Sequence, residues 1–297
     1  MRMVSDNRKL QLMQPQLEKI RKPHNASFRA FVRQERQFPF AWHYHPEFEL
    51  TLVTSGRGRR FVGDHIAEFR EGDLVLLGPL LPHTWRSGPS TPGSKQRRAI
   101  VVQFLETFLG TAIDECKELR LVRQLLTRSR HGLQFMGRHR TVVATQLENL
   151  VKLRPAQKLS ALLNILDELS VAKQTRSLAS KAYAIPRQRT SSPKISQVLE
   201  TIHRDFQRPL RQNDLAQAAD LSRAAFNRNF RQATGTTLVD YVNDLRIGHA
   251  CRMLAESGKP ITEICFESGF TNLSNFNRCF LRRRGMPPSK FRSQFQR

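Results

Sequence analysis

A glycine flanked by two apolar helical stretches constrains the C-terminal part of the chain more than any other feature. The apolar residues that recur at helical spacing are Ile261, Ile264 and Cys265 before it, and Leu273, Phe276, Cys279 and Phe280 after it. Gly269 suits a tight turn between two helices, because glycine adopts positive φ without steric cost. Asn272 is a favourable N-cap for the second helix, and Gly285 with Pro287 ends it. Residues 261–292 therefore predict either a helix-turn-helix or an ordinary helical hairpin with a basic face.

The same arrangement occurs earlier in the chain. A short predicted helix, 214–219, is followed by a turn at Asp220, and Ser222 is an N-cap for a helix over 223–232. Between the two units, residues 238–256 predict one long helix, which at about 1.5 Å per residue spans about 30 Å. One turn of B-DNA is about 34 Å, so the second helix of each unit can enter successive major-groove segments on one face of a duplex.

These strings resemble the signature of AraC/XylS-type transcription regulators. The resemblance lies in Ile-x-x-Ile-Cys at 261–265, the Ser-Gly-Phe turn at 268–270, the Phe276…Phe280 helix and the close at 285–292, and it extends upstream through the first unit. By position it implies that DNA is contacted by Ser222, Arg223, Ala224, Asn227 and Arg228, and by Asn272, Leu273, Ser274, Asn275, Asn277, Arg278 and Arg282. Arginine and asparagine can pair with base edges, and arginine also neutralises phosphates. Arg282 to Arg284 are expected to bind phosphates or to be solvated.

The net charge favours a polyanionic partner. Lys and Arg number 49 against 25 Asp and Glu, which gives +24, and nucleic acid is favoured over a membrane surface. Double-stranded DNA is the predicted partner. The same charge also suits an architectural protein that binds any duplex sequence, so charge alone leaves that alternative open.

The N-terminal part shows a different periodicity. Short alternating segments separated by Gly-rich turns are typical of a compact antiparallel barrel or sandwich. The predicted strands begin at Ser27 and continue over 40–44, 47–54, 59–62, 66–69, 74–77, 83–86 and 99–104.

A His-x-His pair resembles the first motif of the cupin superfamily. His43 and His45 lie two apart on a strand and share a face with Glu49, while His83 follows Gly72 in the place of the second motif. The resemblance implies that these four residues meet inside a barrel, where they suit a divalent metal such as Zn, Fe or Mn. The second motif departs from the family pattern, because Gly78 and Leu80 stand where Pro and Gly are usual.

Two alternatives remain for that region. Phe48, Leu50 and Leu52 could form the buried face of their strand, which would leave Glu49 on a solvated face. The barrel could instead hold a small organic effector without metal. The residues predicted to line such a pocket are Trp42, His43, His45, Glu49, Arg57, His83 and Trp85.

Helical periodicity begins near Ala112 and predicts three apolar stripes, the last starting at Pro155. These helices either mediate a homodimer, as the resemblance implies, or cover the barrel. The predicted organisation is a leader at 1–26, a cupin-like effector-binding barrel at 27–110, a helical segment at 111–171, a linker at 172–192 and a DNA-binding domain at 193–297. The fold class is thus α+β and multidomain: a cupin-like antiparallel β-barrel followed by helices, then an all-α domain with two helix-turn-helix units.

The predicted function is a sequence-specific transcription regulator of the cytoplasm, controlled by a small-molecule effector, with RNA polymerase as a further candidate partner. The alternative is a metal-dependent cupin enzyme joined to a DNA-binding domain. No nucleophile triad, P-loop or Rossmann fingerprint is present, so the chain is not predicted to be an enzyme. No apolar run approaches the about 20 residues of a membrane span. The four cysteines lack the spacing of a zinc site. They are predicted to act as small buried hydrophobic residues.

Overall fold

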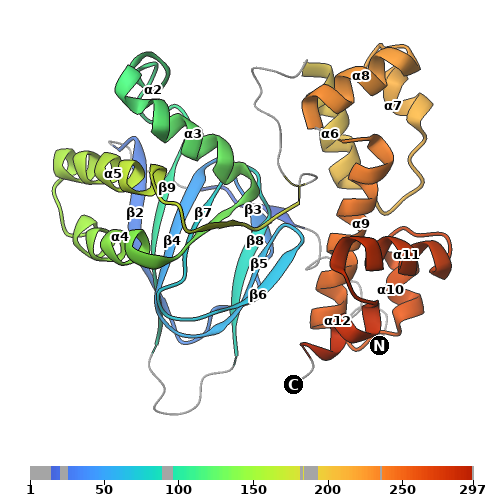
Figure 1. Ribbon diagram of the computed structural model, residues 1–297, viewed down its shortest axis with the longest axis horizontal. Helices are drawn as coiled ribbons and strands as arrows, with labels where there is room; N and C mark the ends of the chain where they lie inside the picture. Colours follow the sequence, from blue (N-terminus) through green and yellow to red (C-terminus); the bar gives the residue numbers. More distant parts are fainter. Residues whose placement is uncertain are drawn as a thin grey trace. The chain divides into compact units, whose positions relative to one another are not determined.

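A computed structural model describes residues 15–20, 26–88, 96–180, 183, 193–234 and 236–295 (Figure 1). The chain forms two compact units, Met1–Leu178 and Ala179–Arg297. The first unit is built on two sheets with helices, and the second is helical, so the predicted fold class is confirmed. No helix among the described residues is both long and apolar enough to cross a membrane.

The smaller sheet of the first unit has the strand order β1-β3-β8-β5-β6. Its strands are β1 Gln16–Leu17, β3 His43–Tyr44, β5 Gly58–Val62, β6 His65–Phe69 and β8 His83–Ser87. The larger sheet has the order β11-β10-β7-β4-β9-β2. Its strands are β2 Phe28–Glu35, β4 Phe48–Ser55, β7 Leu74–Leu77, β9 Arg97–Phe104, β10 Leu133–Phe135 and β11 Thr175–Ser177.

The larger sheet is covered on one face by helices. These are α2 Ala112–Glu115, α3 Arg120–Arg128, α4 Gly137–Leu150 and α5 Pro155–Ser170, with short 3-10 turns at Lys117–Leu119 and Ser129–His131. Leu50 of β4, Leu76 of β7 and Val102 of β9 form one apolar core with Val143 of α4 and Leu166 of α5. Figure 1 shows α4 and α5 lying beside this sheet.

Along the central strand β4 the opposite face of the larger sheet is also buried. Glu49 and Thr51 alternate with Leu50 and Leu52 along β4, yet Glu49 is only 5% exposed and Thr51 only 3%. Their side chains face the interior of the barrel rather than water. The alternative in which Glu49 lies on a solvated face is therefore wrong.

Three short strands were missed or misplaced by the sequence. β1 lies in the predicted leader and pairs in parallel with β3, while β10 and β11 lie in the predicted helical segment and linker and extend the larger sheet beyond β7. Segments of two or three residues are too short to show a period. Elsewhere in the predicted linker, Tyr183 is 3% exposed and its hydroxyl accepts a hydrogen bond from Arg252. Most of the leader and the rest of the linker lie outside the described residues.

The second unit contains two helix-turn-helix motifs. Its helices are α6 Pro193–Asp205, α7 Gln212–Ala218, α8 Arg223–Thr234, α9 Leu238–Glu256, α10 Ile261–Glu267, α11 Leu273–Arg284 and α12 Pro288–Ser293. The predicted bounds of α9 are confirmed, and α7–α8 and α10–α11 are the two motifs. Helix α12 was not expected, although Pro288 at its first position is typical of a helix start.

Aromatic residues hold the motifs to α9. Phe230 of α8 meets the ring of Tyr241 edge-on, with 5.4 Å between ring centroids, and Tyr241 is fully buried. Phe276 and Phe280 of α11 are fully buried as well. Cys251, Cys265 and Cys279 are buried, as the sequence predicts for small hydrophobic residues, whereas Cys116 is exposed.

Candidate functional site

The first candidate site is the exposed face of α8. Phe226 and Phe230 turn inward, and the predicted contact residues Arg223, Ala224, Asn227 and Arg228 are all exposed. Ser222 caps the helix, since its Oγ accepts a hydrogen bond from the N–H of Ala225 at 3.3 Å. The capped end leaves further backbone N–H groups directed outward, which suits a phosphate.

Helix α11 presents the corresponding face of the second motif. Asn272 caps it by accepting from the N–H of Asn275 at 2.8 Å. Asn272, Ser274, Asn277 and Arg278 are exposed, while Leu273 and Asn275 are half-buried. Arg278 Nη2 donates to Asn275 Oδ1 at 3.1 Å, so these two side chains already share one hydrogen bond on the surface.

The arginines that end α11 do not form a free basic cluster. Arg282 Nη2 donates to Asp240 Oδ1 at 3.1 Å, and Arg283 pairs with both Asp240 and Asp244 of α9. The Arg283 side chain is 12% exposed. The prediction that these residues are merely phosphate-binding or solvated is therefore wrong for Arg283, which ties α11 to α9.

The second candidate site is the barrel interior, where three imidazoles meet. His43 on β3 lies opposite His83 on the antiparallel strand β8, with ring centroids 4.4 Å apart, and His45 is 5.0 Å from His83. One nitrogen from each of the three lies within 4.8 Å of the others. The His-x-His pair and His83 are thus brought together as predicted.

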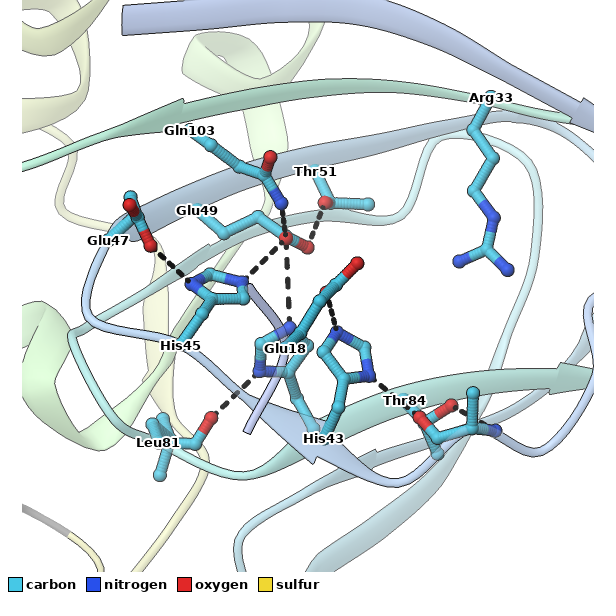
Figure 2. Close-up of polar contacts among 12 residues, drawn as sticks. Glu18, Arg33, His43, His45, Glu47, Glu49, Thr51, Leu81, Thr84 and Gln103 are labelled. Carbon is cyan, nitrogen blue, oxygen red and sulfur yellow. Dashed lines mark hydrogen bonds and ion pairs between the residues drawn. The ribbon is translucent and has the colours of Figure 1, made fainter. Parts of the chain in front are cut away.

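Glu49 reaches the same place from the other sheet. Its carboxylate accepts hydrogen bonds from Thr51 Oγ1 at 2.7 Å and Gln103 Nε2 at 2.9 Å, and lies 3.1 Å from His45 Nε2. Figure 2 shows these side chains converging on Glu49. Thr51 and Gln103 were missed by the sequence, although Thr51 shares the strand parity of Glu49 and could have been found by it.

Backbone carbonyls orient two of the histidines. His43 Nδ1–H donates to the carbonyl of Ala41, and His83 Nδ1–H donates to the carbonyl of Leu81, each at 2.7 Å. This arrangement directs both Nε2 atoms away from the backbone, as in metal-binding histidines, and His43 Nε2 lies 3.1 Å from Glu18 Oε2. His83 Nε2 has no hydrogen-bond partner among the described residues and lies 3.7 Å from Glu49 Oε2. The donor set therefore fits a divalent cation.

The electrostatics of the cluster favour neutral and anionic ligand atoms. Burial, assisted by His83, lowers the pKa of His43 to about 3, so that ring is neutral at pH 7. Burial opposes the charged form of Glu49, but His83 and the hydrogen bond from His45 hold the pKa of that carboxyl well below its usual range. Burial likewise opposes protonation of His45, yet the hydrogen bond and charge of Glu49 raise its pKa.

Three predicted pocket residues have different surroundings. Trp85 is 5% exposed and shares the strand face of His83. Trp42 was predicted to line the interior, but it stacks on Phe40. Phe40 in turn meets Phe61 on the outer face of the smaller sheet. Arg57 is exposed in the turn between β4 and β5, so it does not line the interior as predicted.

An arginine that the sequence did not identify takes that place. Arg60 is fully buried and pairs with Asp73, which also accepts from Gln134 Nε2 at 3.0 Å and Trp85 Nε1 at 3.4 Å. Arg60 lies opposite Trp85 in the strand pairing, and hence on the interior face. Arg60 Nε and Nη2 have no hydrogen-bond partner among the described residues.

Comparison with known proteins covers both units. Residues 25–185 match the model of an AraC-like ligand binding domain, and residues 215–294 match that of a helix-turn-helix domain. The Msm operon regulatory protein of Streptococcus mutans is 24% identical over 269 residues, 88% of this chain and 90% of that protein. The HTH-type transcriptional activator RhaR of Klebsiella pneumoniae is 26% identical over 265 residues, 86% and 88% of the two chains.

Solved structures include the DNA-binding domain of AdpA in complex with a target DNA. The AdpA domain is 25% identical in sequence to the present chain. The match covers 35% of the present chain and 95% of the AdpA chain, with a TM-score of 0.34. The match of the ligand-binding model to more than half of the chain, together with the helix-turn-helix match, decides the family. The chain belongs to the AraC family of transcription regulators, with a ligand-binding domain and a helix-turn-helix DNA-binding domain.

Proposed function

We propose that α8 and α11 are the helices that read DNA, and that one chain places both in neighbouring major-groove segments of an asymmetric site. The observation that carries this proposal is the two-sided character of both helices. Each buries a pair of phenylalanines and exposes a set of Arg and Asn side chains at matching positions, including Arg228 and Arg278. Arginine and asparagine are the side chains best suited to bidentate contacts with guanine and adenine.

Replacing Arg278 with alanine is expected to weaken binding to the preferred site by about 1–3 kcal/mol, because a base contact would be lost. Competition titrations at fixed salt, against a selected site and against random duplex, measure the effect. Arg70→Ala, a change in the barrel at a side chain 80% exposed, controls for net charge. An equal loss on both DNAs would contradict base reading by Arg278 and indicate a phosphate contact instead.

The barrel interior is the proposed site of the effector. Buried polar atoms are ordinarily hydrogen-bonded, and the interior holds Arg60 Nε, Arg60 Nη2 and His83 Nε2 without hydrogen-bond partners among the described residues. A polar small molecule that reached them would be bound through them. Such an effector present at 100 times its Kd should raise the stability of the chain by about 2.7 kcal/mol, and thermal unfolding across a metabolite set would detect it.

A divalent cation held by His43, His45 and His83 is the second proposal for the interior, supported by the carbonyl-fixed orientation of two of these rings. We expect the full chain, incubated with Zn²⁺ and dialysed, to retain one equivalent by elemental analysis and the His83→Asn variant to retain far less, because three-ligand sites lose affinity steeply with one ligand gone. His131→Asn is the control. Equal retention by both variants would contradict this site.

The relatives are transcription regulators, and we propose that this chain likewise acts by binding rather than by catalysis. Stoichiometric iron or manganese in the purified protein, with turnover of a substrate, would favour the enzyme alternative. A homodimer, contact with RNA polymerase and a cytoplasmic location are further proposals that rest on the family. Two reading helices in one chain mean that a dimer is not required to span a full DNA turn.

A further inference from the structure

The end of α6 and the turn of the second helix-turn-helix meet beside α9. A Cβ added to Gly269 would lie 2.8 Å from both the Cα and the carbonyl oxygen of Gln207, two residues beyond the end of α6. Helix α6 packs with α7 and α8, so Gln207 belongs to the first reading unit, whereas Gly269 belongs to the second. The first and second reading units thus touch directly in addition to both packing on α9, the long helix drawn between them in Figure 1.

Arg246 of α9 stabilises this contact through hydrogen bonds to the backbone that follows α6. Its Nε donates to the carbonyl of Phe206 at 2.7 Å and its Nη2 to the carbonyl of Arg208 at 3.0 Å. Carbonyls that follow a helix end lack helical partners and favour a cation there. The same guanidinium lies 5.9 Å from the ring centroid of Phe270, in the turn of the second unit. Arg246 therefore contacts both units at once.

His249, one helical turn further along α9, makes a second bridge. It is 1% exposed and lies 2.9 Å from Gln207 Nε2 through its own Nε2. The amide nitrogen of Gln207 can only donate, so His249 Nε2 accepts and its Nδ1–H faces Ser268 Oγ at 3.3 Å. Ser268 is fully buried at the end of α10. The imidazole is a polar link from the end of α6 to the second turn.

We infer that Gln207, Arg246, His249 and Ser268 form a polar junction that fixes the spacing and angle between the two reading helices, so that the chain accepts its two DNA subsites at one separation only. Long helices are rarely straight and can curve gently along their length. An attachment through α9 alone would allow the second unit to swing, whereas a second contact off the helix axis opposes that swing. Arg246 and His249 are positioning residues that need not touch DNA.

The test varies the spacing between subsites. Starting from a site selected by the full chain, duplexes with one base pair added or removed between the subsites shift one of them by about 3.4 Å and about 35°. Wild type is expected to bind these duplexes at least about tenfold more weakly than the parent, the loss typical of one misplaced contact. The ratio of the two affinities measures the rigidity of the junction.

In the full-length Arg246→Met and Gln207→Ala variants, that ratio is expected to fall at least threefold, because the second unit can follow the displaced subsite. Gln207→Ala removes only one hydrogen-bonding side chain, so it still tests the junction if the Arg246→Met variant does not fold. Lys259→Met is the matched control, since the described ion pairs of Lys259 are with Glu263 and Glu267 of the second reading unit. Its ratio is expected to equal that of wild type.

The outcomes separate this inference from the proposed DNA reading on which it rests. An unchanged ratio in both junction variants, with affinity lowered equally for all spacings, would overturn the inference and leave the reading helices in place. Wild type that binds every spacing equally would contradict reading by two helices, and the inference with it. Arg278→Ala should lower affinity for the parent duplex without raising affinity for the shifted duplexes, whereas a junction variant gains affinity for the shifted duplexes, which marks a reading residue as different from a positioning one.

Discussion

Gly269→Val is expected to abolish specific DNA binding by the full-length chain. Gly269 adopts φ +89, a conformation that costs an L-residue about 1–2 kcal/mol. A side chain there would also meet the backbone of Gln207 at 2.8 Å and Arg246 Nε at 2.9 Å, and such overpacking costs about 1–3 kcal/mol. The second reading helix begins four residues later, so relief of the clash displaces α11 from the groove.

Two other glycines of the same unit separate the two causes. Gly285 has φ +69 and no atom within 4 Å of an added Cβ, so Gly285→Ala tests backbone strain without a clash. Gly258 has an equally open surrounding and no positive φ, so Gly258→Val should be close to wild type. Operator titration and denaturant unfolding of the three variants measure the order expected: Gly269 far more damaging than Gly285, and Gly285 more than Gly258. Normal operator binding by Gly269→Val would contradict the turn geometry.

Arg60→Met is expected to destabilise the barrel by about 3–5 kcal/mol, because it leaves the buried carboxylate of Asp73 without its cation. Gln134 and Trp85 would still donate to Asp73, but neither carries charge. The free energy of unfolding of the full chain, followed through its first transition in urea, measures the loss.

The double change Arg60→Met with Asp73→Leu should recover much of that loss, since no buried charge remains. Arg70→Met is the exposed counterpart: Arg70 lies 3.7 Å from Glu68 with both side chains largely in solvent, and its removal should cost less than about 1 kcal/mol. Equal losses for Arg60→Met and Arg70→Met would show that the buried pair does not stabilise the barrel.

The helical unit could be predicted closely from the sequence because its signals are local. Gly269, the cap residues Ser222 and Asn272, and the apolar period of 238–256 each specify structure within one or two turns. What the sequence did not reveal is tertiary. The pairing of Arg283 with Asp244 and the meeting of Gln207 with Gly269 join residues about forty or more positions apart, which no period records.

The barrel shows the same limit. His43, His45, Glu49 and His83 were identified from their motif spacing, but the surroundings of the site were not. Trp42 is buried against Phe40 and Arg57 lies in an exposed turn, whereas Arg60 and Gln103 are buried in the interior. Strand parity states which residues share a face and not which face is inside. On β4 both faces are buried, so the contrast between its polar and apolar sides does not indicate which side is exposed to solvent.

That doubly covered strand has a consequence for how the barrel assembles. Neighbouring residues of β4 serve two separate chambers, Phe48, Leu50 and Leu52 beneath the helices and Glu49 and Thr51 beside the imidazoles. A shift of the β4–β9 register by one residue would place the Glu49 carboxylate in the apolar core and a leucine beside the histidines. Mispaired intermediates are thereby penalised twice over, and the irregularity between Val53 and Ser55, where the ladder shifts, lies beyond the part that must not slip.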